Sequence, residues 1–90
     1  RQALELGLVQ RVVPDGEVLA QAHELAARIA RQAPLAVRFI KRCVWEGLQM
    51  PLAQGLALER QAFAQLLATR DGQEGVRAFL ERRQPQFQGR

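Results

Sequence analysis

The positions of the prolines constrain the fold of this chain more than any other feature. Pro14, Pro34, Pro51 and Pro85 all stand at the edges of segments whose apolar residues recur every three or four positions. Proline lacks a backbone N–H and cannot continue a helix interior, so each one marks the boundary of an element. The sequence therefore predicts an all-α domain of about four helices with short connections.

We expect these helices over residues 17–32, 34–48 and 51–68 and from Asp71 to about Gln84. The first has an alanine-rich stripe, which would let a neighbouring helix approach closely. In the last helix Asp71 and Glu74, three residues apart, form the pattern of a capping box. Gly75 weakens a helix interior by about 1 kcal/mol relative to alanine, which indicates that another group approaches closely there.

The first 14 residues form a lead-in of a different kind. Residues 1–6 resemble the end of a helix that stops at Gly7, since glycine accepts the left-handed conformation there. Residues 8–13 are short and β-branched, which predicts a brief strand or extended segment that ends at Pro14. Such a strand would need a partner outside this sequence or in another copy. Asp15 could then cap the next helix.

Composition excludes several classes of protein. Thirteen Lys and Arg side chains against nine Asp and Glu give a net charge of +4, but both signs are interleaved, so a solvated surface is favoured over a nucleic-acid interface. No run approaches the roughly 20 apolar residues of a membrane span. A single cysteine favours a reducing compartment, hence a cytoplasmic protein. The chain opens on Arg1 and its only methionine is Met50, so we expect it to be part of a longer or processed protein.

Three side chains are candidates for metal binding or catalysis. His23 has no second histidine or cysteine within sequence reach, so we expect a surface residue and no metal site. Cys43 lacks a histidine or acid that would complete a nucleophile system and is expected to be a partly buried small hydrophobe. Glu59 interrupts an apolar stripe of the helix expected over residues 51–68, so it is either a general base or half of an ion pair with Lys41 or Arg60. The other residues that share this face are Leu52, Leu56, Phe63, Leu66 and Leu67. We favour the ion pair.

The end of the chain offers one candidate binding site. Phe79 and Arg82 are three residues apart, which on a continuous helix places them on one face, and Arg83 follows. An aromatic ring beside a guanidinium suits a purine base and its phosphates. The alternative is that Phe79 belongs to the core and Arg82 is merely solvated.

The ordered set of motifs resembles the enoyl-CoA hydratase/isomerase (crotonase) family over essentially the whole chain. The closing signature is the most informative part, and its matching residues here are Thr69, Asp71, Glu74-Gly75, Ala78-Phe79, Arg82-Arg83 and Pro85-x-Phe87. Earlier pieces follow in the family's order: Ala3 with Gly7-Leu8-Val9 and Val12-Val13-Pro14, the helix from Ala22 to Ala30, Pro34-x-Ala36 with Lys41, and Glu59 with Phe63.

This resemblance implies the C-terminal helical region that follows a ββα spiral core, with residues 1–14 ending the core and residues 15–90 forming the helical domain. In the family this region packs between subunits of trimers or paired trimers. The oxyanion hole and the catalytic glutamates belong to the core, so no catalytic residue is expected here. No cofactor is expected either, since acyl-CoA is the substrate of the family. Phe79 and Arg82 match the positions that help close the CoA adenine and phosphate pocket of a neighbouring subunit.

Two other interpretations remain. The chain could be a free-standing helical interaction or oligomerisation domain with no enzyme attached, which an upstream spiral core would exclude. A basic helical nucleic-acid binder would show a steep salt dependence of binding. The resemblance itself leaves the reaction type open between hydration, isomerisation and related thioester chemistry.

Overall fold

A computed structural model describes all of residues 1–90 and shows a helical chain without a strand. Four long helices follow a short helix and a 3₁₀ turn, in the order α1 (Gln2–Glu5), η1 (Asp15–Glu17), α2 (Val18–Ala30), α3 (Pro34–Gly47), α4 (Leu52–Leu67) and α5 (Arg70–Leu80). The prediction of an all-α chain is thus confirmed, with helix bounds close to those that the prolines indicate. The division into residues 1–14 and 15–90 stays a prediction.

The strand expected at residues 8–13 does not form. Residues 11–14 have no regular secondary structure, and only Gly7, with a φ of 73°, behaves as predicted at the end of α1. A strand exists only as part of a hydrogen-bonded ladder, and no other extended segment of the chain lies beside this one. Asp15 also differs from its prediction, because it opens η1 and makes no capping hydrogen bond.

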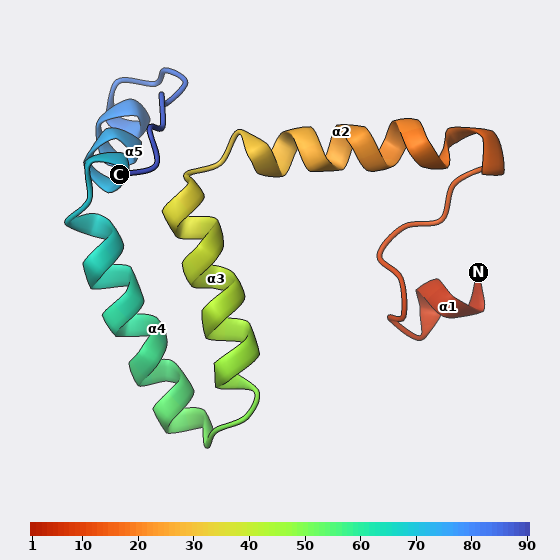
Figure 1. Ribbon diagram of the computed structural model, residues 1–90, viewed down its shortest axis with the longest axis horizontal. Coiled ribbons are helices and arrows are strands. Elements are labelled where there is room, and N and C mark those ends of the chain that lie inside the picture. The colour runs from red at the N-terminus through yellow and green to blue at the C-terminus, as the bar shows by residue number, and fades with distance from the viewer.

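Helices α3 and α4 form an antiparallel hairpin, and α5 packs near the end of α4 and the start of α3 (Figure 1). Two glycines set the closest approach in the hairpin: a Cβ on Gly55 would lie 3.5 Å from the carbonyl oxygen of Gly47. A second close approach joins α4 to α5, where a Cβ on Gly72 would collide with the carbonyl oxygen of Leu66. At Gly72 any side chain would therefore separate the two backbones, whereas at Gly55 a Cβ would just touch the facing helix.

Helix α2 projects away from the hairpin as an arm and carries α1 at its far end (Figure 1). None of its 13 residues is buried, and Leu25 and Ile29 of its apolar stripe are 44% and 50% exposed. The radius of gyration is 16.5 Å, whereas a compact domain of this length has about 12 Å. The chain therefore presents apolar helix faces that it does not cover itself.

The chain buries very little of its own surface. Only three residues are buried, namely Ala62, Ala78 and Asp71. The accessible surface is 7897 Å², whereas a compact protein of this mass exposes about 5,300 Å². None of the helices combines the length and the apolar character that a membrane-spanning helix needs.

Candidate functional site

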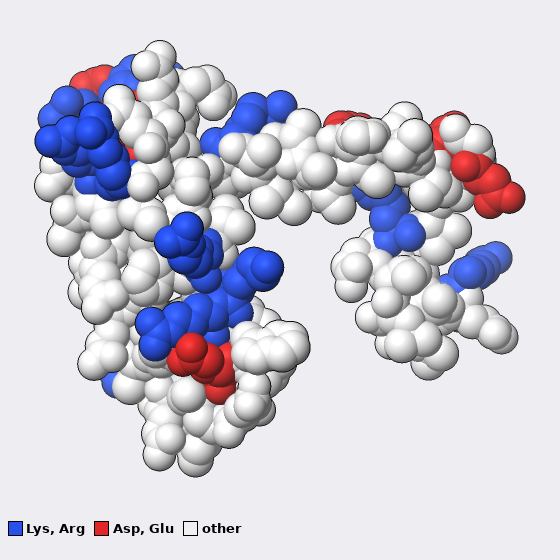
Figure 2. Space-filling view, viewed as in Figure 1, with Lys and Arg blue, Asp and Glu red and all other residues white.

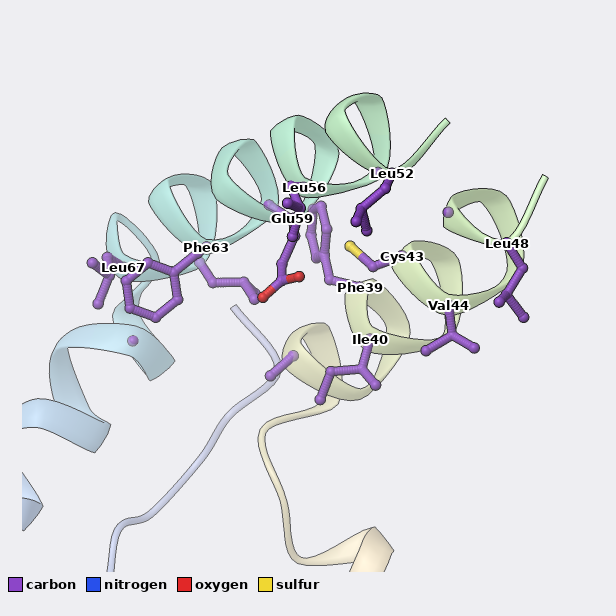
Figure 3. Close-up of a pocket in the computed structure, with 16 residues that line it drawn as sticks. Phe39, Ile40, Cys43, Val44, Leu48, Leu52, Leu56, Glu59, Phe63 and Leu67 are labelled. Atoms are coloured by element: carbon purple, nitrogen blue, oxygen red, sulfur yellow. The ribbon is translucent and has the colours of Figure 1, made fainter. Parts of the chain in front are cut away.

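A broad apolar groove runs between α3 and α4. It encloses about 740 Å³ and is bordered by Gly47 and Gly55, where the two helices touch (Figure 3). Twelve of its 16 lining residues are hydrophobic, among them the stripe that the sequence predicts on α4: Leu52, Leu56, Phe63, Leu66 and Leu67. The stripe is therefore confirmed as a shared face, but Leu56 and Phe63 remain 48% and 62% exposed, so this face is a groove wall and not a finished core.

Glu59 is the one charged residue in this groove, and its carboxylate points between the helices (Figure 3). The predicted ion pair with Lys41 or Arg60 is wrong, because none of the ion pairs of the chain includes Glu59. Arg60 is the next residue on the helix, and consecutive side chains do not face each other. Lys41 does not line the groove. The groove thus offers a carboxylate without a second polar group that could assist general base catalysis.

The other candidate side chains are placed as predicted. His23 is exposed on α2, and Cys43 is a half-buried free thiol that lines the groove with its sulfur among apolar side chains. No group of three His, Cys, Asp or Glu side chains gathers where it could hold a metal ion.

The chain end folds back onto α5 and is held by Asp71. This carboxylate is 3% exposed and accepts hydrogen bonds of 2.7 Å from the backbone N–H groups of Gln88 and Gly89. Its own N–H donates to the carbonyl of Arg90 at 2.8 Å. The predicted cap role of Asp71 is therefore wrong. Thr69 is the cap and its hydroxyl accepts from the N–H of Gly72 at 3.0 Å, because α5 begins one residue before Asp71.

Glu74 makes a second attachment between α5 and the tail. Arg83 donates to both carboxylate oxygens of Glu74, from Nη1 to Oε1 at 2.6 Å and from Nη2 to Oε2 at 3.0 Å. The backbone N–H of Gln86 donates to the same carboxylate at 3.0 Å. These hydrogen bonds, led by that of Arg83, lower the pKa of Glu74 to about 2, and the hydrogen bonds of Arg83 with Glu74 and then Glu81 raise the pKa of Arg83. Between the two carboxylates the ring of Phe87 lies against Gly75. The close approach predicted at Gly75 thus comes from the chain's own tail.

Phe79 and Arg82 are neighbours at the end of α5, although not in the way their spacing predicts. The helix stops at Leu80, and Arg82 takes the left-handed conformation with a φ of 52°. The two residues therefore do not share a helix face; they meet because the N–H of Arg82 donates to the carbonyl of Phe79 at 3.2 Å. The Phe79 side chain is 82% exposed, so it does not belong to the core of this chain.

Charge is distributed unevenly around this corner. Lys and Arg side chains gather over the α5 end of the molecule and over α3, in both places with acidic side chains among them, whereas acidic side chains predominate at the far end of the α2 arm (Figure 2). At the end of α5 the guanidinium of Arg83 is held by carboxylates, and that of Arg82 has no ion pair. An exposed aromatic ring and an unpaired cation at the same helix end can bind a planar base and an anionic group.

Sequence reasoning missed the attachment of the tail. A signal was present, since Asp71 and Glu74 lie one turn apart on α5 and Pro85 and Gly89 break any helix beyond them. A carboxylate in a first helical turn was interpreted as a cap because the spacing fits one. The backbone N–H groups that it binds are 17 and 18 positions away, which no local pattern encodes.

The helical arrangement is that of solved crotonase-type structures. An enoyl-CoA hydratase from Bacillus anthracis superposes with a TM-score of 0.91 at 40% identity, over 99% of this chain and 34% of that one. An enoyl-CoA hydratase/isomerase from Mycobacterium paratuberculosis gives a TM-score of 0.93 at 40% identity, over 99% and 35%. The fold of the chain is therefore that of a segment found in these enzymes.

Sequence comparison leads to the same family. Residues 1–90 match the family described as enoyl-CoA hydratase/isomerase. The chain is 43% identical over 90 residues to 2,3-dehydroadipyl-CoA hydratase of Escherichia coli strain K12, which covers 100% of this chain and 35% of that protein. It is 42% identical over 89 residues to enoyl-CoA hydratase EchA19 of Mycobacterium tuberculosis, covering 99% and 34%. The chain belongs to the enoyl-CoA hydratase/isomerase family and spans about a third of the length of the curated relatives it matches.

Proposed function

We propose that this chain is the C-terminal helical third of a cytoplasmic enoyl-CoA hydratase or isomerase that acts on acyl-CoA thioesters. The observation that carries this proposal is the match of all 90 residues to the family, combined with a span of about a third of each relative. Within that enzyme the chain supplies subunit association and part of the CoA pocket. It supplies no catalytic residue, because the oxyanion hole and catalytic glutamates of the family belong to the spiral core.

Unburied surface supports the assembly role. The chain exposes 7897 Å², about 2,600 Å² more than a compact protein of its mass. That excess is comparable to the area buried in an obligate interface. Two regions contribute to this exposed area, namely the groove between α3 and α4 and the apolar stripe of α2. Both carry leucine, isoleucine and valine side chains that are about half exposed. The spiral core and other subunits, in a trimer or a pair of trimers, are the partners we propose for these faces.

The end of α5 supports the second role. Phe79 and Arg82 would contact the CoA of a neighbouring subunit, the ring by stacking on adenine and the guanidinium by binding a phosphate. The negative end of the helix dipole lies at this terminus and disfavours an anion. The free charge of Arg82 is therefore essential to any phosphate site here.

The enzyme as a whole is tested by assaying the longer protein that contains this chain. We expect it to hydrate crotonyl-CoA or 2,3-dehydroadipyl-CoA or to shift the double bond of a 3-enoyl-CoA, and we expect residues 1–90 alone to do neither. The absence of all these activities in a folded, complete protein would contradict the proposal. A free-standing helical interaction domain would then be the better interpretation.

The CoA contact is tested by Arg82→Ala in the same protein. We expect KM for the acyl-CoA to rise about fivefold, the size of one exposed charge contact, with kcat unchanged. Inhibition by CoA should weaken more than inhibition by 3′-dephospho-CoA if Arg82 binds the 3′-phosphate. Arg70→Ala is the matched control, because Arg70 is an exposed residue without an ion pair at the opposite end of α5. An unchanged KM in Arg82→Ala would remove Arg82 from the site.

A further inference from the structure

The end of α5 is built like the end of α1, with one substitution that changes its chemistry. At α1 the N–H of Leu8 donates to the carbonyl of Ala3 and the intervening Gly7 has a φ of 73°. At α5 the N–H of Arg83 donates to the carbonyl of Ala78 at 3.0 Å, and Arg82 takes the position of that glycine with a φ of 52°. Both are the hydrogen-bonded helix ending in which glycine is the usual residue.

An arginine in this position requires a compensating cause. The left-handed conformation is unfavourable for a residue with a Cβ and routine only for glycine, and to a lesser extent asparagine. Strained backbone of this kind persists where the surrounding structure holds it, and it is concentrated at binding sites. The side-chain contacts around this turn are made by the next residue, Arg83.

Arg83 uses its whole guanidinium within the protein. It binds both oxygens of Glu74, donates through Nε to Glu81 at 2.5 Å, and reaches the carbonyl of Gln84 at 3.3 Å. These contacts join the residues on either side of Arg82 to each other and to Glu74 on α5. Glu74 is in turn fixed by the N–H of Gln86, which ties this arrangement to the tail.

The same contacts decide which cation is free. Glu81 directly precedes Arg82 and is the carboxylate closest to it in sequence, yet its oxygen is taken by Arg83. With Glu74 and Glu81 both bound to Arg83, the Arg82 guanidinium has no ion pair. If Arg83 were removed, the carboxylate of Glu81 would be released next to Arg82 and would compete with any anionic ligand for it.

We propose that Arg83 is a positioning residue for the anion site of Arg82: at the left-handed turn that Arg82 forms, it withdraws the carboxylate of Glu81 from that guanidinium. This inference rests on the proposed function, in which Arg82 binds a CoA phosphate. Arg83 itself does not touch the ligand. Its role is to keep the neighbouring cation at the end of α5 free of an ion pair.

A double-variant experiment in the complete enzyme tests this role, with crotonyl-CoA or the best enoyl-CoA substrate as the probe. We expect Arg83→Gln to raise KM about fivefold with little change in kcat, matching Arg82→Ala, because Glu81 then neutralises Arg82. Adding Glu81→Gln to Arg83→Gln should restore KM to within about twofold of the parent value. Glu81→Gln alone should leave KM unchanged or lower it. Arg83→Lys keeps the charge but loses the bidentate hydrogen bonds to Glu74, so its KM should lie between those of the parent and of Arg83→Gln.

Rescue is the result that a merely structural role cannot produce, since removing Glu81 restores none of the contacts that Arg83 made with Glu74 and Gln84. If the double variant keeps the raised KM of Arg83→Gln, the withdrawal of Glu81 is overturned. If Arg82→Ala raises KM and Arg83→Gln does not, Arg83 has no positioning role although Arg82 still binds CoA. If neither variant changes KM, the proposed CoA site fails and this inference fails with it.

The chain contains a matched control for the loss of an exposed ion pair. Arg42 donates to Glu46 at 2.9 Å on α3, and neither residue contacts α5 or the tail. We expect Arg42→Gln to leave KM unchanged. Should Arg83→Gln fold too poorly to assay, the comparison of Arg83→Lys with Arg83→Lys/Glu81→Gln decides the same question, with a restored KM in the double variant supporting the proposal.

Discussion

Helices α5 and α2 are nearly equal in length, with 11 and 13 residues, but α5 with its tail and the α2 arm are stabilised in different ways. The α5 unit is closed by directed polar contacts: Asp71 and Glu74 bind the backbone N–H groups of the tail, and Ala78 and Asp71 are buried. The arm has an apolar stripe that is about half exposed and one side-chain hydrogen bond, from Arg11 to Gln21 at 2.9 Å, to anchor the segment before it.

This difference shows two ways in which a segment can depend on its surroundings. Hydrogen bonds to a returning tail satisfy the α5 unit locally, so that its conformation is determined within about 20 residues. An apolar stripe lowers the free energy only when another surface covers it, and a single helix of 13 residues is marginal in water. The arm therefore depends on a partner, and the α5 unit carries its own constraints.

The largest expected effect is a difference in amide hydrogen exchange within the isolated 90-residue chain. We expect amides of α5 and of Gln88 and Gly89 to exchange about a hundredfold more slowly than those of α2, because α2 has no covering surface. In the complete protein α2 should become protected as well. Equal protection of both regions in the isolated chain would contradict the dependence of the arm on a partner.

The next effect breaks the α5 unit at its buried carboxylate. Asp71→Asn replaces one accepting oxygen with an NH₂ group and leaves a tail N–H unpaired, so we expect the free energy of unfolding to fall by about 2 kcal/mol. Urea denaturation of the complete protein measures this. Asp15→Asn is the control, since Asp15 makes no capping hydrogen bond and should change stability by less than about 0.5 kcal/mol. Equal effects in both variants would show that Asp71 does not hold the tail.

The smallest effect is a pH dependence of the tail. The pKa of Glu74 is lowered from 4.5 to about 2 by Arg83 and Gln86, so its contribution to stability is fully present above about pH 4.5. That contribution is lost as the pH falls toward 2. The protection of the Gln86 amide, measured as its exchange rate relative to the intrinsic rate at each pH from 6 to 2, should fall across this window more in the parent than in Glu74→Gln. Identical profiles would exclude the Glu74 contact as a source of the pH dependence.

Much of the fold could be predicted from local patterns. Pro34 and Pro51 precede or open α3 and α4 as expected, because a missing N–H has a definite local consequence. The apolar stripe of α4 was also predicted, since helical spacing alone determines which side chains share a face. Gly7 was predicted at the end of α1 for a conformational reason that requires no neighbour.

Predictions that needed a distant partner were less accurate. The spacing of residues predicted an ion pair for Glu59, but no cation lines the groove. Spacing also predicted that Asp71 caps α5, whereas Thr69 is the cap. Phe79 and Arg82 were expected on one helix face because three residues separate them. The helix ends between them, and Arg83, just beyond that end, binds Glu74, nine positions away.

The sequence by itself determined that this chain is helical, where its helices begin and end to within a few residues, and which family it resembles. These properties depend on backbone chemistry and on periodicities of three to four residues. Only the tertiary structure decided that Asp71 and Glu74 hold the tail, that Arg82 is left-handed and unpaired, and that Glu59 faces an open groove. Those outcomes depend on which hydrogen-bonding groups meet after the chain turns back, and their free energy belongs to pairs of residues that are not neighbours in the sequence.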